Sequence, residues 1–87
     1  MSMLRFEWDP EKDHANQEKQ GVAFFEAKGV FGDPLARTRY DAKHSTSADP
    51  FIAFGYAEAS GRLLVVRHTD RNDSIGLISA RPPGFRS

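Results

Sequence analysis

The chain has 87 residues, no cysteine, and 12 Lys/Arg against 12 Asp/Glu, so its formal net charge is zero. A chain of this length forms one domain that buries roughly 60% of its unfolded-chain surface. The lack of cysteine excludes disulfides and thiolate metal sites, and no apolar run approaches the ~20 residues of a membrane span. We therefore expect one small cytoplasmic domain whose core is built by side-chain packing alone.

The charges are unevenly distributed along the chain. Residues 1–59 hold seven Lys/Arg against ten Asp/Glu (net −3), and residues 60–87 hold five Arg against two Asp (net +3). A net charge of zero and the lack of a basic recognition helix make direct DNA binding a poor third hypothesis. The split instead favours an anionic ligand at the C-terminal part and a basic partner at the N-terminal part.

The N-terminal elements are a strand and a helix. The segment MLRFEW contains Phe and Trp, alternates loosely, and predicts a strand that stops at Asp9. Asp9 as a cap, Pro10 at the first helical position and Glu11 in the first turn predict a helix over residues 10–20, which Gly21 ends. The helix is almost entirely polar, so we expect it to lie on the surface.

A second, amphipathic helix follows in VAFFEAKGVF. Phe24, Ala27, Val30 and Phe31 recur at helical spacing and predict a helix face that packs on a sheet. The Gly-Asp-Pro sequence at 32–34 ends it.

Four strands complete the domain. The expected strands are Leu35–Tyr40, Phe51–Glu58, Arg62–Thr69 and Ser74–Arg81, with a polar connection over residues 41–50. We predict an α+β fold: strand, helix, helix and then a four-strand antiparallel meander, with the helices packed on one face of the sheet. The domain spans residues 1–81, and residues 82–87 (PPGFRS) form an irregular C-terminal tail.

The candidate site residues gather around RHTDRNDSIGLISAR. Residues two apart in a strand share a face, so His68 lies on the face of Arg62, at the strand end beside Arg71. Arg81 is placed on the face of Ile75, at the opposite end of the hairpin. We therefore expect His68 and Arg71 to converge, and Arg81 to meet Arg62.

These residue types match the chemistry of RNA cleavage by the 2′-hydroxyl. Histidine moves protons near neutral pH, and the planar fork of arginine binds phosphate. The structural alternative is that His68 is a hydrogen-bonded strand-end residue and Arg71 a solvated turn residue. Trp8 fits a core anchor or a base-stacking platform, and Lys12 fits helix solvation or an RNA contact. The three histidines lack the spacing of a zinc site, so no metal or other cofactor is expected.

The segments FEWDPEK, KQGVAFFEA, VFGDPL, GRLLVVRHTDR and ISAR follow one another over about residues 5–81. In this order and spacing they resemble the BrnT toxins of bacterial type II toxin–antitoxin systems. The resemblance implies a RelE-like ribonuclease fold, RNA cleavage without a metal, and a BrnA-type antitoxin that binds DNA and represses the operon. It makes Arg71, Arg81 and His68 the expected catalytic residues, and Trp8, Lys12 and Arg62 the expected RNA contacts.

The sequence also departs from the family pattern. Gln20 stands where a histidine is usual, Gly76 where an arginine is common, and PPGFRS where the family continues into a basic helix. A second hypothesis is therefore a catalytically degenerate module that binds the antitoxin and takes part in operon autoregulation. Under either hypothesis we expect a hetero-oligomer in which a basic antitoxin pairs with the acidic Glu11, Asp13 and Glu18.

Overall fold

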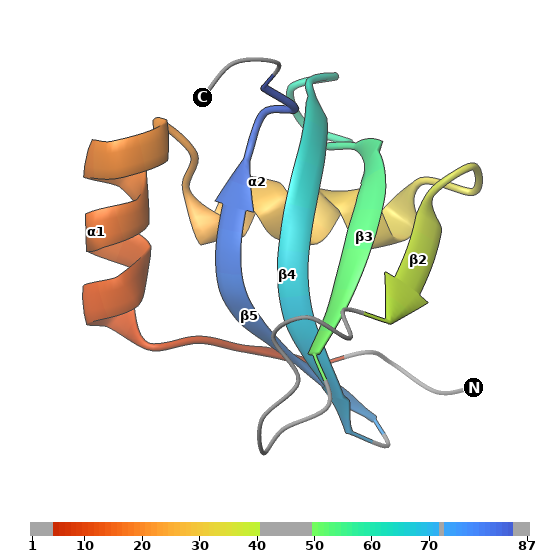
Figure 1. The fold of residues 1–87 in the computed structure, drawn as a ribbon, viewed down its shortest axis with the longest axis horizontal. Helices are drawn as coiled ribbons and strands as arrows, with labels where there is room; N and C mark the ends of the chain where they lie inside the picture. The colour runs from red at the N-terminus through yellow and green to blue at the C-terminus, as the bar shows by residue number, and fades with distance from the viewer. Residues whose placement is uncertain (1–4, 41–49, 72, 85–87) are drawn as a thin grey trace.

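The computed structural model describes residues 5–40, 50–71 and 73–84 (Figure 1). Its elements are β1 (Arg5–Glu7), α1 (Pro10–Gln20), α2 (Phe24–Ala27), the 3₁₀ helix η1 (Lys28–Gly32), β2 (Arg37–Tyr40), β3 (Pro50–Tyr56), β4 (Leu63–Arg71) and β5 (Ser74–Arg81). The fold is α+β, as expected from the sequence. The predicted connection at 41–50 lies outside the described residues, except for Pro50, which begins β3. Within them, no helix has the length and apolar character needed to span a membrane.

The sheet is mixed, which corrects the expectation of an antiparallel sheet. Its order is β1-β5-β4-β3-β2, and β2 to β5 are antiparallel neighbours. β1 joins the far side of β5 in parallel, with Arg5 opposite Ser74 and Glu7 opposite Gly76. This pairing joins the two ends of the chain, so no local pattern in the sequence indicates it.

The two helical layers take different positions. α2 and η1 cover one face of the sheet, whereas α1 lies beside the edge of β5, so the expectation of both helices on one face was wrong (Figure 1). Asn16 explains the position of α1, because its buried amide donates to the carbonyls of Val22 and Ala80 at 2.8 Å each. Its Oδ1 accepts from the Ala80 N–H at 3.2 Å. β1 pairs only with Ser74–Gly76, so Asn16 occupies the open edge of β5 beyond it, as a strand would.

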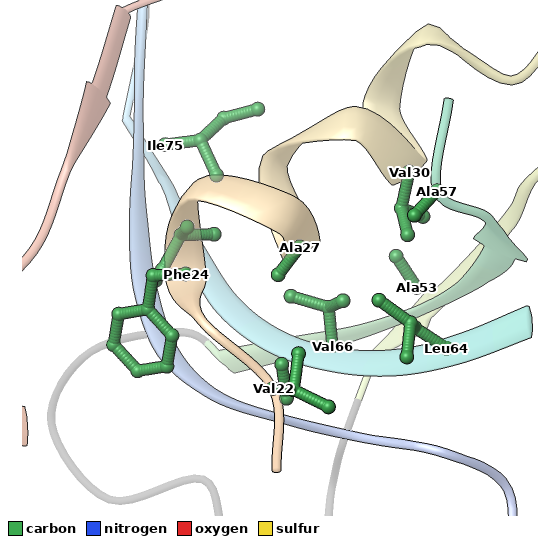
Figure 2. Close-up of a cluster of buried hydrophobic side chains, with 11 residues drawn as sticks. Val22, Phe24, Ala27, Val30, Ala53, Ala57, Leu64, Val66 and Ile75 are labelled. Atoms are coloured by element: carbon green, nitrogen blue, oxygen red, sulfur yellow. The ribbon is translucent and has the colours of Figure 1, made fainter. Parts of the chain in front are cut away.

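The core lies between α2–η1 and the sheet (Figure 2). Ala27 and Val30 point from the helical segment toward Val66 and Leu64, and Phe24 lies at the other end of the same cluster. These five side chains are fully buried, so truncating Phe24 to alanine should cost about 3–5 kcal/mol.

The second helix is shorter than its pattern predicts. Only one α-turn forms before the chain tightens into η1 at Lys28. A Cβ at Gly29 would lie 2.8 Å from the backbone nitrogen of Glu58, so η1 approaches the end of β3 at a distance that only glycine permits.

A β-bulge interrupts the pairing of β4 with β5. Arg67 lies opposite Ser79, but His68 lies opposite Leu77, so Ile78 is an extra residue without a partner in the register. An inserted residue shifts the two-residue alternation of a strand by one.

The bulge decides the orientation of the last residues of β5. Ile75 and Leu77 are buried on the helix-covered side before the bulge, and Ala80, opposite Val66, is buried there after it. Arg81 therefore points to the other side of the sheet, which corrects its expected placement beside Ile75.

Candidate functional site: an open sheet face and its cleft

We call the sheet surface opposite α2 and η1 the open face, since no described helix covers it. Strand alternation and register place on it Arg37, Arg39, Ile52, Phe54, Tyr56, Leu63, Val65, Arg67, Thr69, Arg71, Ser79 and Arg81. Among the described residues of β2 to β5, this face has five arginines and no Asp or Glu. A positive, partly aromatic surface of this kind suits a polyanion.

The arginines form rows across the strands. One row across the strands contains Arg37, Phe54, Val65 and Arg81. The next row contains Arg39, Ile52, Arg67 and Ser79. Strands are spaced by about 4.8 Å, so Arg37 and Arg81 are roughly 14 Å apart across the sheet.

A cleft of about 360 Å³ opens at the end of the open face where β1 joins the sheet. Its lining includes Trp8, Lys12 and Arg71, three of the residues singled out in the sequence, together with Glu7 and Gly76. With Asp9, which also lines it, the cleft brings together one aromatic side chain, two cations and two carboxylates.

Local structure positions the Trp8 and Lys12 side of the cleft. Trp8 is half-buried and packs edge-on against Phe24, with ring centroids 6.1 Å apart, so its ring is anchored in the core while it borders the cleft. The Asp9 carboxylate caps α1 by accepting the Glu11 N–H at 2.9 Å. This cap starts the helix so that Lys12, in its first turn, lines the cleft.

Arg71 and Gly76 lie on the opposite side of the cleft. β4 continues to Arg71, two residues beyond the predicted strand end, so the alternation carries Arg71 onto the open face with Thr69. A Cβ at Gly76 would lie 2.7 Å from Thr69 Oγ1. The absence of a side chain at Gly76 therefore keeps the cleft floor open.

His68 lies on the other side of the sheet, so it does not converge with Arg71. It is 2% exposed, with its ring edge-on to Phe31 (4.9 Å) and stacked on Phe51 (5.8 Å). Nδ1 lies 3.3 Å from the Thr69 carbonyl oxygen, and within the described residues the buried Nε2 has no hydrogen-bond partner. Burial lowers the pKa of His68. The hydrogen bond to the Thr69 carbonyl and the charge of Asp70 act to raise this pKa, but they offset the effect of burial only in part.

Arg62 and Arg81 do not meet either. Arg62 precedes β4 and forms a two-pronged ion pair with Glu26, with its Nε and Nη2 at 2.8 and 2.7 Å from the carboxylate. It also donates to the Gly21 carbonyl at 3.0 Å. The Arg62 hydrogen bonds lower the pKa of Glu26. Arg81 instead lies opposite Val65 and donates to the Pro82 carbonyl at 3.3 Å.

The sequence alone did not single out the β2–β3 part of the open face. A hollow of about 580 Å³ there is lined by Arg37, Thr38, Arg39 and Phe54. The Arg39 guanidinium lies over the Phe54 ring, 5.8 Å from its centroid. Two-residue alternation within the expected strand Leu35–Tyr40 is enough to place both arginines on one face, but only the pairing with β3 shows that this face is the open one.

The acidic residues of α1 serve partly in the fold. Asp13 Oδ1 accepts from the Phe24 N–H at 2.9 Å and from Gln17 at 3.2 Å, so it links α1 to the start of α2. In the part of the chain that the structure describes, no group of three His, Cys, Asp or Glu side chains could hold a metal ion.

Five arginines on an open sheet face, beside a cleft that holds a tryptophan, two cations and two carboxylates, are chemically suited to a phosphate-containing polymer. The family model described as "Ribonuclease toxin, BrnT, of type II toxin-antitoxin system" matches residues 8–83. The chain therefore belongs to the BrnT family of ribonuclease toxins. As a toxin of a type II system, it has an antitoxin as its partner.

The comparison of structures agrees with this at the level of the fold. The crystal structure of the Brucella abortus ribonuclease toxin BrnT is similar with a TM-score of 0.69 at 20% sequence identity, covering 95% of this chain and 100% of that chain. No curated protein sequence matches the chain.

Proposed function

We propose that this chain cleaves single-stranded RNA internally, with the scissile phosphate in the cleft and the adjoining nucleotides on the open face. The observation that carries the proposal is the meeting of Trp8, Lys12 and Arg71 in one cleft. The cleft shares the sheet surface of the other arginines, so one strand of RNA can contact both.

The roles follow from the chemistry of each side chain. Glu7 carries the proposed base, because its carboxylate has no hydrogen bond to another described residue, whereas Asp9 already caps α1. It takes the proton of the 2′-hydroxyl, whose oxygen then attacks the adjacent phosphorus. Arg71 and Lys12 stabilise the charge on the phosphorane, and Trp8 stacks on a neighbouring base. The bond to the 5′-oxygen breaks, that oxygen takes a proton from water, and a 2′,3′-cyclic phosphate and a 5′-hydroxyl result.

The other expected site residues receive different roles. Arg81 remains a proposed phosphate contact, now on the open face away from the cleft. His68 is assigned to the core because it is buried among aromatic rings, and Arg62 to the ion pair with Glu26. We further propose that the toxin acts on cytoplasmic RNA and forms a hetero-oligomer with a BrnA-type antitoxin.

The test uses the purified full chain and a labelled single-stranded RNA in the presence of EDTA. We expect cleavage that yields a 2′,3′-cyclic phosphate, detected by mass spectrometry, and no cleavage of the all-deoxy strand. R71A and K12A should each lower the single-turnover rate by about 10²-fold or more. K19A is the matched control, because Lys19 is exposed on the same helix two turns away and lines no part of the cleft.

Full activity of folded R71A and K12A would contradict the assignment of the cleft. A folded chain that binds the antitoxin but cleaves no RNA would instead support the degenerate interaction module.

A further inference from the structure

Glu7, Gly76 and Thr69 form one row across three neighbouring strands in the cleft. Glu7 of β1 lies opposite Gly76 of β5, which in turn lies opposite Thr69 of β4, and all three line the cleft. Residues opposite one another in a sheet point to the same face, here the open face. Two strand spacings separate the backbones of Glu7 and Thr69 by roughly 10 Å, and the residue between them has no side chain. We call this row the slot: it has a carboxylate on one side and a hydroxyl on the other.

The Thr69 hydroxyl leans over the slot. Its Oγ1 lies 2.7 Å from the position that a Cβ on Gly76 would take, so this orientation depends on the glycine. A β-branched side chain has few χ1 rotamers, which leaves the hydroxyl few other positions. Thr69 is half-buried, and its hydroxyl has no hydrogen bond to another described residue. Its donor and its acceptor groups are therefore available to a ligand.

The 2′-hydroxyl of a ribose suits the two sides of the slot, because it has one proton to donate and lone pairs that accept. Between Glu7 and Thr69 it donates to the carboxylate and accepts from the threonine hydroxyl, so its O–H bond points at the proposed base. As this proton leaves, the 2′-oxygen becomes negative and the hydrogen bond from Thr69 strengthens. The contact therefore stabilises the transition state more than the bound substrate.

The slot lies within reach of the proposed phosphate site. Thr69 and Arg71 are two residues apart on β4 and share the open face, about 7 Å apart along the strand. The long side chain of an arginine spans such a distance. A phosphate held by Arg71 and a 2′-oxygen above Gly76 can therefore belong to the same nucleotide.

We propose that Thr69 is a positioning residue, whose hydroxyl holds the 2′-oxygen of the attacking ribose above Gly76 with its proton toward Glu7. Thr69 keeps its own proton, and the proton of the 2′-hydroxyl passes to Glu7. The inference rests on the proposed function, because it places the ribose in the same cleft. It adds that the cleft itself recognises the sugar, through a group that deoxyribose cannot engage.

Single-turnover cleavage of the labelled RNA by the purified full chain tests this role. T69V keeps the branched shape of the side chain without the hydroxyl. It should lower the rate at saturating protein about 10-fold or more, while the protein concentration that gives half the maximal rate changes less than about 3-fold. T69S retains the hydroxyl and is the matched control, with a rate within about 3-fold of the parent chain.

Two further measurements separate positioning from binding and from packing. A 2′-O-methyl RNA strand, which cannot be cleaved, measures binding to the open face, and the parent chain and T69V should bind it equally. In G76A a methyl group meets the Thr69 hydroxyl and turns it away, so the rate should fall as in T69V although residue 69 is unchanged.

Equal rates of folded T69V and the parent chain overturn the role of Thr69 and leave the proposed function standing. Equal losses in T69V and T69S overturn it too, because packing and not the hydroxyl would then matter. A rate of G76A equal to that of the parent contradicts the need for an open floor in the slot. If the parent chain cleaves no RNA, the proposed function itself fails, and the slot fails with it.

Discussion

The environment of His68 sets a pH dependence on stability at the scale of a single residue. Its pKa is lowered from the ordinary value of 6.5, chiefly by burial. Above that value the imidazole is neutral in both the folded and the unfolded chain, so His68 does not reduce the free energy of unfolding. As the pH falls below it, the unfolded chain binds a proton that the folded chain does not, so stability is lost.

We expect the free energy of unfolding of the parent chain to decrease from pH 7.5 to 5.5, and that of H68L to change much less. Urea denaturation at both pH values measures this. Glu26 and Asp33, whose pKa values are lowered by hydrogen bonds, lose their contributions at lower pH and do not interfere. Equal pH dependence in the two proteins would show that His68 is solvated. Folded H68L should retain RNA cleavage, because the ring does not reach the cleft.

Asn16 matters at the scale of elements, because it replaces a strand partner along the edge of β5. We expect N16A to lower the free energy of unfolding by about 2–4 kcal/mol, since it leaves three buried backbone groups without partners. Q17A is the matched control, because Gln17 is exposed and bonds only to a neighbouring side chain; it should change stability by less than about 0.5 kcal/mol. Equal losses in the two variants would contradict the role of Asn16.

The elements also show where sequence patterns suffice. α1 begins and ends as predicted because its signals are local: Asp9 caps it, Pro10 opens it, and Gly21 adopts a left-handed φ of 72°. The parallel position of β1 depends on its pairing with β5 at the other end of the chain, and the bulge at Ile78 depends on the register between β4 and β5. No local pattern in the sequence predicts either of them. For the same reason Trp8, Lys12 and Arg71 could be singled out, whereas their meeting in a cleft and the part played by Arg37 and Arg39 could not.

At the scale of the whole molecule, the distribution of charge matters more than its sum. The formal net charge is zero, yet the charged side chains on the described open face of β2 to β5 are all positive. Affinity for RNA should therefore come from local contacts with phosphates and depend on salt.

We expect the logarithm of the binding constant for a 2′-O-methyl strand to fall linearly with the logarithm of salt concentration. Each arginine that contacts a phosphate contributes about 0.7 to the slope, so R37Q/R39Q should flatten it by roughly 1.4. K19Q/K28Q removes the same charge from α1 and η1, outside the open face, and should leave the slope unchanged. Equal flattening in both variants would mean that overall charge, and not the open face, determines binding.

The bulge at Ile78 determines which side of the sheet the last residues of β5 present. If Ile78 instead took a regular place in the alternation, with the same residues and no bulge, Arg81 would turn toward the core and Ala80 would be exposed on the open face. Loss of the bulge at the same strand length would thus exchange a buried position for a charged one without changing any letter of the terminal SAR. Between relatives, equivalent positions in this strand are therefore found by counting from the bulge, and an arginine in the same motif can belong to the core side in one chain and to the open face in another.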